Sequence, residues 1–169
     1  MKTQKILYGF TLIELLVVIS IIGILAALAI FGMQSAFKNS RNTQRKSDLR
    51  QYQSSLENYA NANNGLYFAR TSATGIAASN LSGAGTNLCS GLTLSNCPED
   101  PSWTTSGQPI YRYQSDGTGG TPNATKYLLW ATLETTPVKY WIVCSTGKSG
   151  EQPNTWTPPG SPNTGTCPL

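Results

Sequence analysis

Residues 10–37 read FTLIELLVVISIIGILAALAIFGMQSAF, and this stretch decides what kind of molecule the chain forms. It carries one charged residue, Glu14, and shows no polar face before Gln34. A water-soluble helix carries a polar face beside its apolar stripe, whereas about 18 or more apolar residues in a row are typical of a transmembrane helix. We therefore predict that residues 10–37 form a helix whose surroundings are lipid or other apolar helices.

A short basic leader, MKTQKILYG, precedes this stretch and contains Lys2 and Lys5. In an ordinary secretory signal the cleavage site follows the apolar region. Here Gly9 precedes it, so cleavage after Gly9 would leave the helix on the mature protein and give Phe10 a new α-amine. Lys2 and Lys5 favour a cytoplasmic N-terminus, but basic residues between 38 and 50 favour the opposite orientation, so charge alone leaves the question open.

Glu14 is the most specific single residue of the apolar stretch. A charge within a transmembrane helix costs about 2.5–3.5 kcal/mol on insertion scales, and such residues are commonly paired and functional. After cleavage, Phe10 and Glu14 would share one helix face, so the carboxylate could pair with the amine of its own chain or of a neighbour. The alternative is a Glu near the membrane interface that is hydrated or protonated. The residues by themselves leave both interpretations open.

A second periodic pattern follows the apolar stretch. One helical stripe is formed by Leu49, Tyr52, Leu56, Tyr59 and Asn63. The sequence Asn63-Asn64-Gly65 predicts the end of the helix, because Asn and Gly tolerate the left-handed conformation. We expect one helix from about residue 10 to 63, roughly 80 Å long. Its part at 38–65 is amphipathic and packs on the chain's own domain.

Residues 66–169 are expected to form a globular head. Three segments favour strands, namely 110–114, 126–133 and 138–144. The turn at Thr135-Thr136-Pro137 predicts that the last two pair as an antiparallel hairpin. Residues 69–108 read as a polar connection, and residues 145–169 as a Pro/Gly/Thr-rich tail without a periodic pattern. The predicted fold class is therefore α+β, with a long N-terminal helix packed on a small antiparallel sheet.

The chain has four cysteines, all in its C-terminal half: Cys89, Cys97, Cys144 and Cys167. An even number in a Gly/Pro/Ser-rich region favours disulfides and an extracytoplasmic compartment. Three pairings are open. We favour Cys144–Cys167, which would close the tail onto the last predicted strand, together with Cys89–Cys97, which would close a small loop.

The composition disfavours an enzyme. The chain has no His, which excludes imidazole bases, His-containing triads and His-ligated metal sites. Its eight acidic residues are scattered, which argues against a carboxylate metal cage, and the cysteine spacing does not fit zinc. We expect no catalytic residue, no metal and no cofactor.

A basic cluster follows the apolar stretch and consists of Lys38, Arg41, Arg45, Lys46 and Arg50. Lys38, Arg41 and Arg45 fall on one helix face, as a contact stripe requires. The cluster could touch lipid phosphates, acidic neighbours or DNA, or it could be a solvated face. DNA is the least favoured of these partners, because no aromatic residues are interleaved with the charges.

The N-terminal region resembles the prepilin signal shared by type IV pilins and the pseudopilins of type II secretion. The resemblance rests on the basic leader ending in Gly9, on Phe-Thr-Leu-Ile-Glu at 10–14 and on the apolar run. Residues 48–67 also look like the end of the long helix of the major-pseudopilin-like branch. Two departures are the lack of any Pro before Pro98 and the presence of Lys148 where pseudopilins carry an acidic calcium loop.

The resemblance implies a type IV pilin-like fold and a sequence of processing, membrane insertion and assembly steps. A prepilin peptidase would cut between Gly9 and Phe10 and methylate the amine of Phe10, and Glu14 would set the register between subunits. Residues 1–9 would be lost, and residues 10–37 would form the membrane anchor and then the filament core. The precursor would lie in the cytoplasmic membrane with its head outside. An inner-membrane platform driven by a cytoplasmic ATPase would then add it to a surface filament of identical or related pilin subunits.

The sequence therefore predicts a structural subunit of a type IV pilus or pilus-like filament. A pseudopilin of a type II secretion system is the first alternative. A membrane-anchored exported binding domain that never polymerises is an alternative of another class, and an enzyme is disfavoured by composition.

Overall fold

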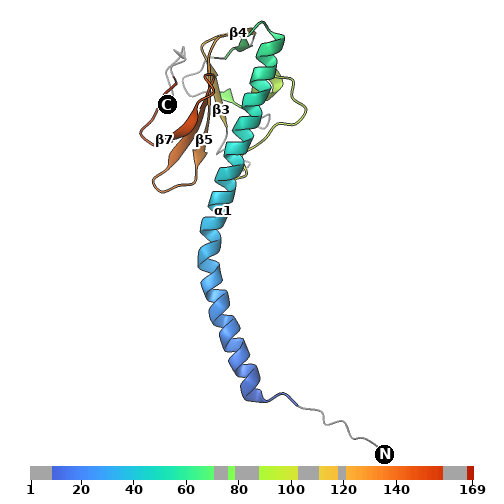
Figure 1. Ribbon diagram of the computed structural model, residues 1–169, viewed down its shortest axis with the longest axis vertical. Helices are drawn as coiled ribbons and strands as arrows, with labels where there is room; N and C mark the ends of the chain where they lie inside the picture. The colour runs from blue at the N-terminus through green and yellow to red at the C-terminus, as the bar shows by residue number, and fades with distance from the viewer. Residues whose placement is uncertain (1–8, 71–75, 79–87, 103–110, 118–120, 158–166) are drawn as a thin grey trace, which may run out of the picture. The chain divides into compact units, whose positions relative to one another are not determined.

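The computed structural model describes residues 9–70, 76–78, 88–102, 111–117, 121–157 and 167–169. The chain divides into two compact units, residues 1–37 and residues 38–169. Helix α1, Leu12–Ala62, begins in the first unit and ends in the second (Figure 1). The predicted helix of about residues 10–63 is thus confirmed to within two residues at each end.

The end of α1 has the predicted left-handed geometry. Asn64 and Gly65 have φ angles of 57° and 81°. The N–H of Gly65 donates to the carbonyl of Ala60 at 2.8 Å, which satisfies one of the carbonyls that the last helical turn leaves without a partner. Asn and Gly accept this conformation at low cost, so the helix stops where the sequence indicated.

The second unit contains a five-stranded antiparallel sheet in the order β2-β3-β5-β6-β7 (Figure 1). Its strands are β2 Ile76–Ala77, β3 Arg112–Ser115, β5 Tyr127–Leu133, β6 Lys139–Cys144 and β7 Ser149–Pro153. A separate pair joins β1, Tyr67–Phe68, to β4, Pro122–Ala124. The predicted hairpin is confirmed, because β5 and β6 pair from Leu128 opposite Cys144 to Leu133 opposite Lys139.

The sheet has an apolar cluster on each face. On one face, Tyr113, Leu129 and Val143 pack in the same cluster as the α1 stripe, where Leu49, Tyr52 and Leu56 are fully buried. The other face carries Leu128, Trp130, Ile142 and Cys144, against which Tyr140, Trp156, Cys167 and Leu169 pack. Successive residues of a strand point to opposite faces, so β5 is buried almost throughout because both of its faces are covered.

Two parts of the head differ from the sequence prediction. The tail at 145–169 was expected to lack regular structure, but Ser149–Pro153 forms the edge strand β7. This strand contains Gly, Pro, Glu and Gln, which are poor strand formers, and it is positioned by its register with β6. The connection at 69–108 contains β2 and a short helix α2, Leu88–Gly91, whose Leu88 and Cys89 are buried.

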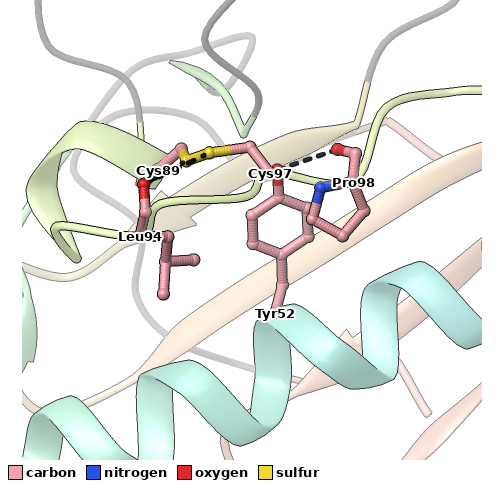
Figure 2. The surroundings of a disulfide bond; sticks show 5 residues. All are labelled: Tyr52, Cys89, Leu94, Cys97 and Pro98. Carbon is pink, nitrogen blue, oxygen red and sulfur yellow. Dashed lines mark hydrogen bonds between the residues drawn. A yellow bond between two sulfur atoms is a disulfide. The ribbon is translucent and has the colours of Figure 1, made fainter.

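Residues 98–102 lie beside α1 and bind it through hydrogen bonds and an ion pair. The hydroxyl of Tyr52 donates to the carbonyl of Pro98 at 2.9 Å, next to the Cys89–Cys97 disulfide (Figure 2). Farther along, Arg45 binds Asp100 and Ser102. The disulfide therefore lies directly before a segment that α1 holds at several points.

Candidate processing and assembly site

The Gly9–Phe10 junction lies immediately before α1. Gly9, Phe10 and Thr11 have no regular secondary structure, and the helix starts at Leu12. The side chain of Phe10 is 75% exposed, and a Cβ added at Gly9 would meet nothing within 4 Å. The peptide bond between Gly9 and Phe10 is therefore in non-helical, accessible backbone, as a protease substrate requires.

Thr11 and Glu14 form a reciprocal cap at the start of the helix. One carboxylate oxygen of Glu14 accepts from the N–H of Thr11 at 2.9 Å and from its hydroxyl at 2.7 Å. The hydroxyl oxygen of Thr11 in turn accepts from the N–H of Glu14 at 3.3 Å. This is a capping box, in which the two side chains satisfy amides that the first helical turn leaves unbonded. The structure thus gives Glu14 a partner within its own chain, in addition to the two interpretations drawn from the sequence.

In the apolar half of α1, the large apolar side chains that the structure describes are exposed. The large apolar side chains from Phe10 to Leu28 are between 46% and 82% exposed. By length and composition, α1 is the one helix in the described part of the chain that could cross a membrane. So much exposed apolar surface requires lipid or other apolar helices around it.

Comparison with protein families identifies this region. A family model for the prokaryotic N-terminal methylation motif matches residues 8–30, which include Gly9, Phe10 and Glu14. This segment is a class III prepilin signal. Among curated proteins and solved structures, nothing matches the chain.

The prepilin signal supports a type IV pilin or a pseudopilin and does not distinguish the two. It implies that a prepilin peptidase processes the chain and that the product assembles with pilin subunits. Together with the exposed apolar helix, it supports a membrane-anchored precursor. Such signals are typical of structural subunits, which are not enzymes.

Behind the prepilin signal, the head contains two disulfides. The structure pairs Cys89 with Cys97 and Cys144 with Cys167, the pairing favoured from the sequence. Cys144 is the last residue of β6, and Cys167 packs with Trp156 and Leu169 on the face of the sheet that α1 leaves uncovered. The second disulfide therefore ties the tail to a strand inside the sheet.

Three members of the basic cluster, Arg41, Arg45 and Lys46, are paired with the head, whereas Lys38 and Arg50 are exposed. Arg45 is 1% exposed, and its guanidinium binds Asp100 at 2.7 and 2.8 Å and Asn42 at 2.9 Å. Arg41 binds Glu134 through two hydrogen bonds, and Arg45 also approaches Glu134, at 2.8 Å. The hydrogen bonds from Arg41 lower the pKa of Glu134 to about 2. These arginines hold the head on α1, which the sequence could not show because their acidic partners lie far along the chain.

Lys46 is paired as well. Its ammonium group lies 3.2 Å from Glu151 of β7 and 4.4 Å from the centre of the Trp141 ring. Glu151 also binds Lys139 at 3.0 Å, and these lysines lower the pKa of Glu151. Among the described residues, no ion pair involves Lys38 or Arg50.

Sequence reasoning identified Gly9, Phe10 and Glu14, which lie at or just before the start of α1, but it overlooked Thr11, the residue that Glu14 binds. A signal for Thr11 was available, because Thr followed three residues later by Glu before an apolar run is the sequence pattern of a capping box. Asn42, Asp100 and Glu134 gave no comparable signal.

No group of three or more His, Cys, Asp or Glu side chains that could hold a metal ion occurs in the described ranges. Lys148, which stands where pseudopilins carry an acidic calcium loop, lies in the tight turn between β6 and β7. In this turn the N–H of Cys144 donates to the carbonyl of Lys148 at 2.9 Å, and Gly147 has a φ angle of 81°.

Proposed function

We propose that the chain is a structural subunit of a type IV pilus or pilus-like extracellular filament. The observation that carries this proposal is the exposed apolar half of α1, which begins directly after a prepilin cleavage junction. A prepilin peptidase removes residues 1–9 and methylates Phe10. An inner-membrane platform driven by a cytoplasmic ATPase then moves the subunit from the bilayer into the filament.

Assembly exchanges one apolar environment for another. In the membrane, lipid covers residues 10–37, and in the filament the same residues of neighbouring subunits cover them. Surface that is already out of water in lipid loses little by moving among other apolar helices. Glu14 sets the axial register by meeting the amine of a neighbouring Phe10, because a buried charge without a partner is strongly unfavourable.

The remaining divisions of the chain follow from this proposal. Residues 38–65 are the amphipathic half of the helix, and residues 66–169 form the head on the outer side of the membrane. The two disulfides support that orientation, because disulfides persist in oxidising compartments.

A type II secretion pseudopilin is the second candidate, since the same signal serves both classes. Lys148 in the β6–β7 turn favours the pilus over this alternative, because it stands where an acidic calcium loop is expected. A role in binding DNA is disfavoured by the ion pairs of Arg41, Arg45 and Lys46 with acidic residues of the head.

The processing step is tested by mass spectrometry of the protein from cells. The mature chain should begin at Phe10 and carry one methyl group on its amine. Gly9→Arg should block cleavage by placing a bulky charge at the junction, whereas Lys5→Arg, which keeps the leader charge, should be processed normally. A mature protein that keeps Met1–Gly9 would instead favour an anchored domain that never polymerises.

The filament itself is tested by imaging surface filaments from cells with and without the gene. Filaments that disappear with the gene and return with a plasmid copy support the pilus. Unchanged filaments combined with a defect in protein secretion would favour the pseudopilin.

A further inference from the structure

If Phe37 lies at the edge of the hydrocarbon core, as the proposed function implies, Arg41 lies at the level of the lipid headgroups. It follows Phe37, the last residue of the apolar segment, by four residues, or about 6 Å along a helix. The headgroup layer on each side of a bilayer is about 5–7 Å thick. A guanidinium at that level has a natural ligand in a lipid phosphate, whose oxygens it can bind with two parallel hydrogen bonds.

In the folded head, the guanidinium of Arg41 already binds the carboxylate of Glu134. Nε of Arg41 donates to one oxygen of Glu134 at 2.8 Å, and Nη2 donates to the other. The side chains of Arg41 and Glu134 remain 35% and 25% exposed, so the pair faces solvent. The Glu134 carboxylate thus takes the same two donors that a phosphate would use.

Glu134 is held in this position by groups other than Arg41. Its N–H donates to the side-chain oxygen of Asn42 at 2.8 Å, and its carboxylate accepts from the hydroxyl of Ser102 at 2.9 Å. The buried guanidinium of Arg45 lies 2.8 Å from the same carboxylate oxygen. Since Asn42 and Arg45 are both buried, Glu134 is fixed by the fold rather than drawn in by a flexible surface arginine.

We propose that Glu134 masks Arg41 from the phosphate of anionic membrane lipids. The head then binds headgroups weakly although five basic residues follow its membrane segment. The benefit of this masking rests on the proposed function. A subunit that must leave the bilayer moves more easily if lipid headgroups do not bind its head tightly. The masked site itself can be tested without any filament.

The test uses the purified full-length chain in micelles of a neutral detergent, titrated with phosphatidylglycerol, with bound lipid counted by native mass spectrometry. Glu134→Gln should bind this lipid about fivefold more tightly than the wild type, the effect expected of one basic residue at an anionic surface. The gain should vanish in about 1 M NaCl, where charges are screened within about 3 Å. Phosphatidylcholine should show no gain.

Matched variants separate the site from net charge. Glu151→Gln adds the same unit of charge but frees Lys46, which lies nine residues beyond Phe37, and Lys139 of β6, so its gain should be clearly smaller. The double variant Arg41→Gln/Glu134→Gln should return to wild-type affinity. Inorganic phosphate, titrated separately, should not compete at millimolar concentration if the membrane lipid is the ligand.

Several outcomes would overturn the proposal. Equal gains from Glu134→Gln and Glu151→Gln would show an effect of net charge alone, and a gain that survives in the double variant would exclude Arg41. If Glu134→Gln does not fold, Arg41→Gln decides the question. A masked arginine predicts that its removal lowers lipid binding no more than Lys46→Gln, which also removes one paired positive charge, whereas a clearly larger loss would show that Arg41 already contacts lipid. None of these results depends on whether the subunit forms filaments, which the imaging experiment tests separately.

Discussion

The two halves of α1 share one backbone and differ in what surrounds them. Between Phe10 and Leu28 the large apolar side chains are at least 46% exposed, whereas Leu49, Tyr52 and Leu56 are fully buried. The first half has apolar residues on all sides and a single charge. The second has one apolar stripe, and its charged residues pair with the head. One helix therefore has an exposed apolar part, which ends at Phe37, and a part that packs on the head, whose first ion pair is made by Arg41.

The consequence of exposing a side chain therefore differs between the two halves of α1. In the second half, an exposed residue such as Arg50 contributes little to folding. In the first half, the proposed function makes the exposed residues the surface that contacts lipid or neighbouring subunits. Substitutions in the two halves should consequently affect different measurements.

The largest expected effect is on assembly and comes from the first half. Glu14→Ala should reduce sheared surface filament by about tenfold or more, because a neighbouring amine would be buried without a counter-charge. Insertion of the subunit should be unchanged or improved, since the helix loses a charge. Glu14→Gln keeps the volume and should behave in the same way. Normal filament yield from Glu14→Ala as the only copy would disprove the register role.

The largest effect on folding should come from Arg45. Arg45→Ala leaves the buried Asp100 carboxylate without its ion partner and should destabilise the head by about 3–5 kcal/mol. Arg50→Ala, an exposed arginine on the same helix, should stay within about 0.5 kcal/mol of the wild type. Thermal unfolding in detergent, followed by near-ultraviolet circular dichroism, measures both. Similar melting temperatures for the two variants would contradict the structural role of Arg45.

A pair of leucine variants compares the two halves of the helix directly. Leu56→Ala creates a cavity in the cluster on the sheet and should cost about 2–5 kcal/mol of head stability. Leu16→Ala removes the same atoms from a side chain that is 53% exposed and should leave head unfolding unchanged. The same unfolding measurement applies. A comparable loss in both variants would mean that the halves do not differ as described.

The tail disulfide should contribute a somewhat smaller amount. Replacing Cys144 and Cys167 by Ser should destabilise the head by roughly 3 kcal/mol in the chain-entropy estimate. A peptide map under non-reducing conditions should show Cys144 linked to Cys167 and Cys89 linked to Cys97. Free thiols in protein purified without reductant, or crossed pairs, would exclude this pairing.

The smallest effect is a dependence on pH that comes from Glu134. Its pKa falls from 4.5 to about 2 because of the hydrogen bonds from Arg41, followed by those from Ser102 and Arg45. A lowered pKa stabilises the fold fully above the unfolded value, so this contribution should be present above pH 4.5 and lost as the pH falls toward 2. The stability difference between wild type and Glu134→Gln should shrink across that window. A constant difference would contradict this assignment.

Local patterns predicted the parts of the fold whose causes are local. The α1 stripe, the stop at Asn64-Gly65 and the β5–β6 hairpin each depend on residues close in sequence. The edge strand β7 was missed because its residues are poor strand formers and its position comes from pairing with β6. The burial of Arg45 could not be predicted, because its partner Asp100 lies 55 residues away in the sequence. The spacing of the basic cluster was equally consistent with a solvent-exposed helix face.

The Cys144–Cys167 bridge also determines how the head would respond to a pulling force. Cys144 ends β6, which has hydrogen-bonded neighbours on both sides, β5 and β7. The bridged residues are 23 positions apart, and the chain between them would bear no load applied at Cys167. Such a load passes through the covalent bond into β6, so β7 cannot be peeled from the sheet one hydrogen bond at a time. The β5–β6 and β6–β7 ladders would have to shear together, which makes the interior strand β6 the mechanical anchor of the head.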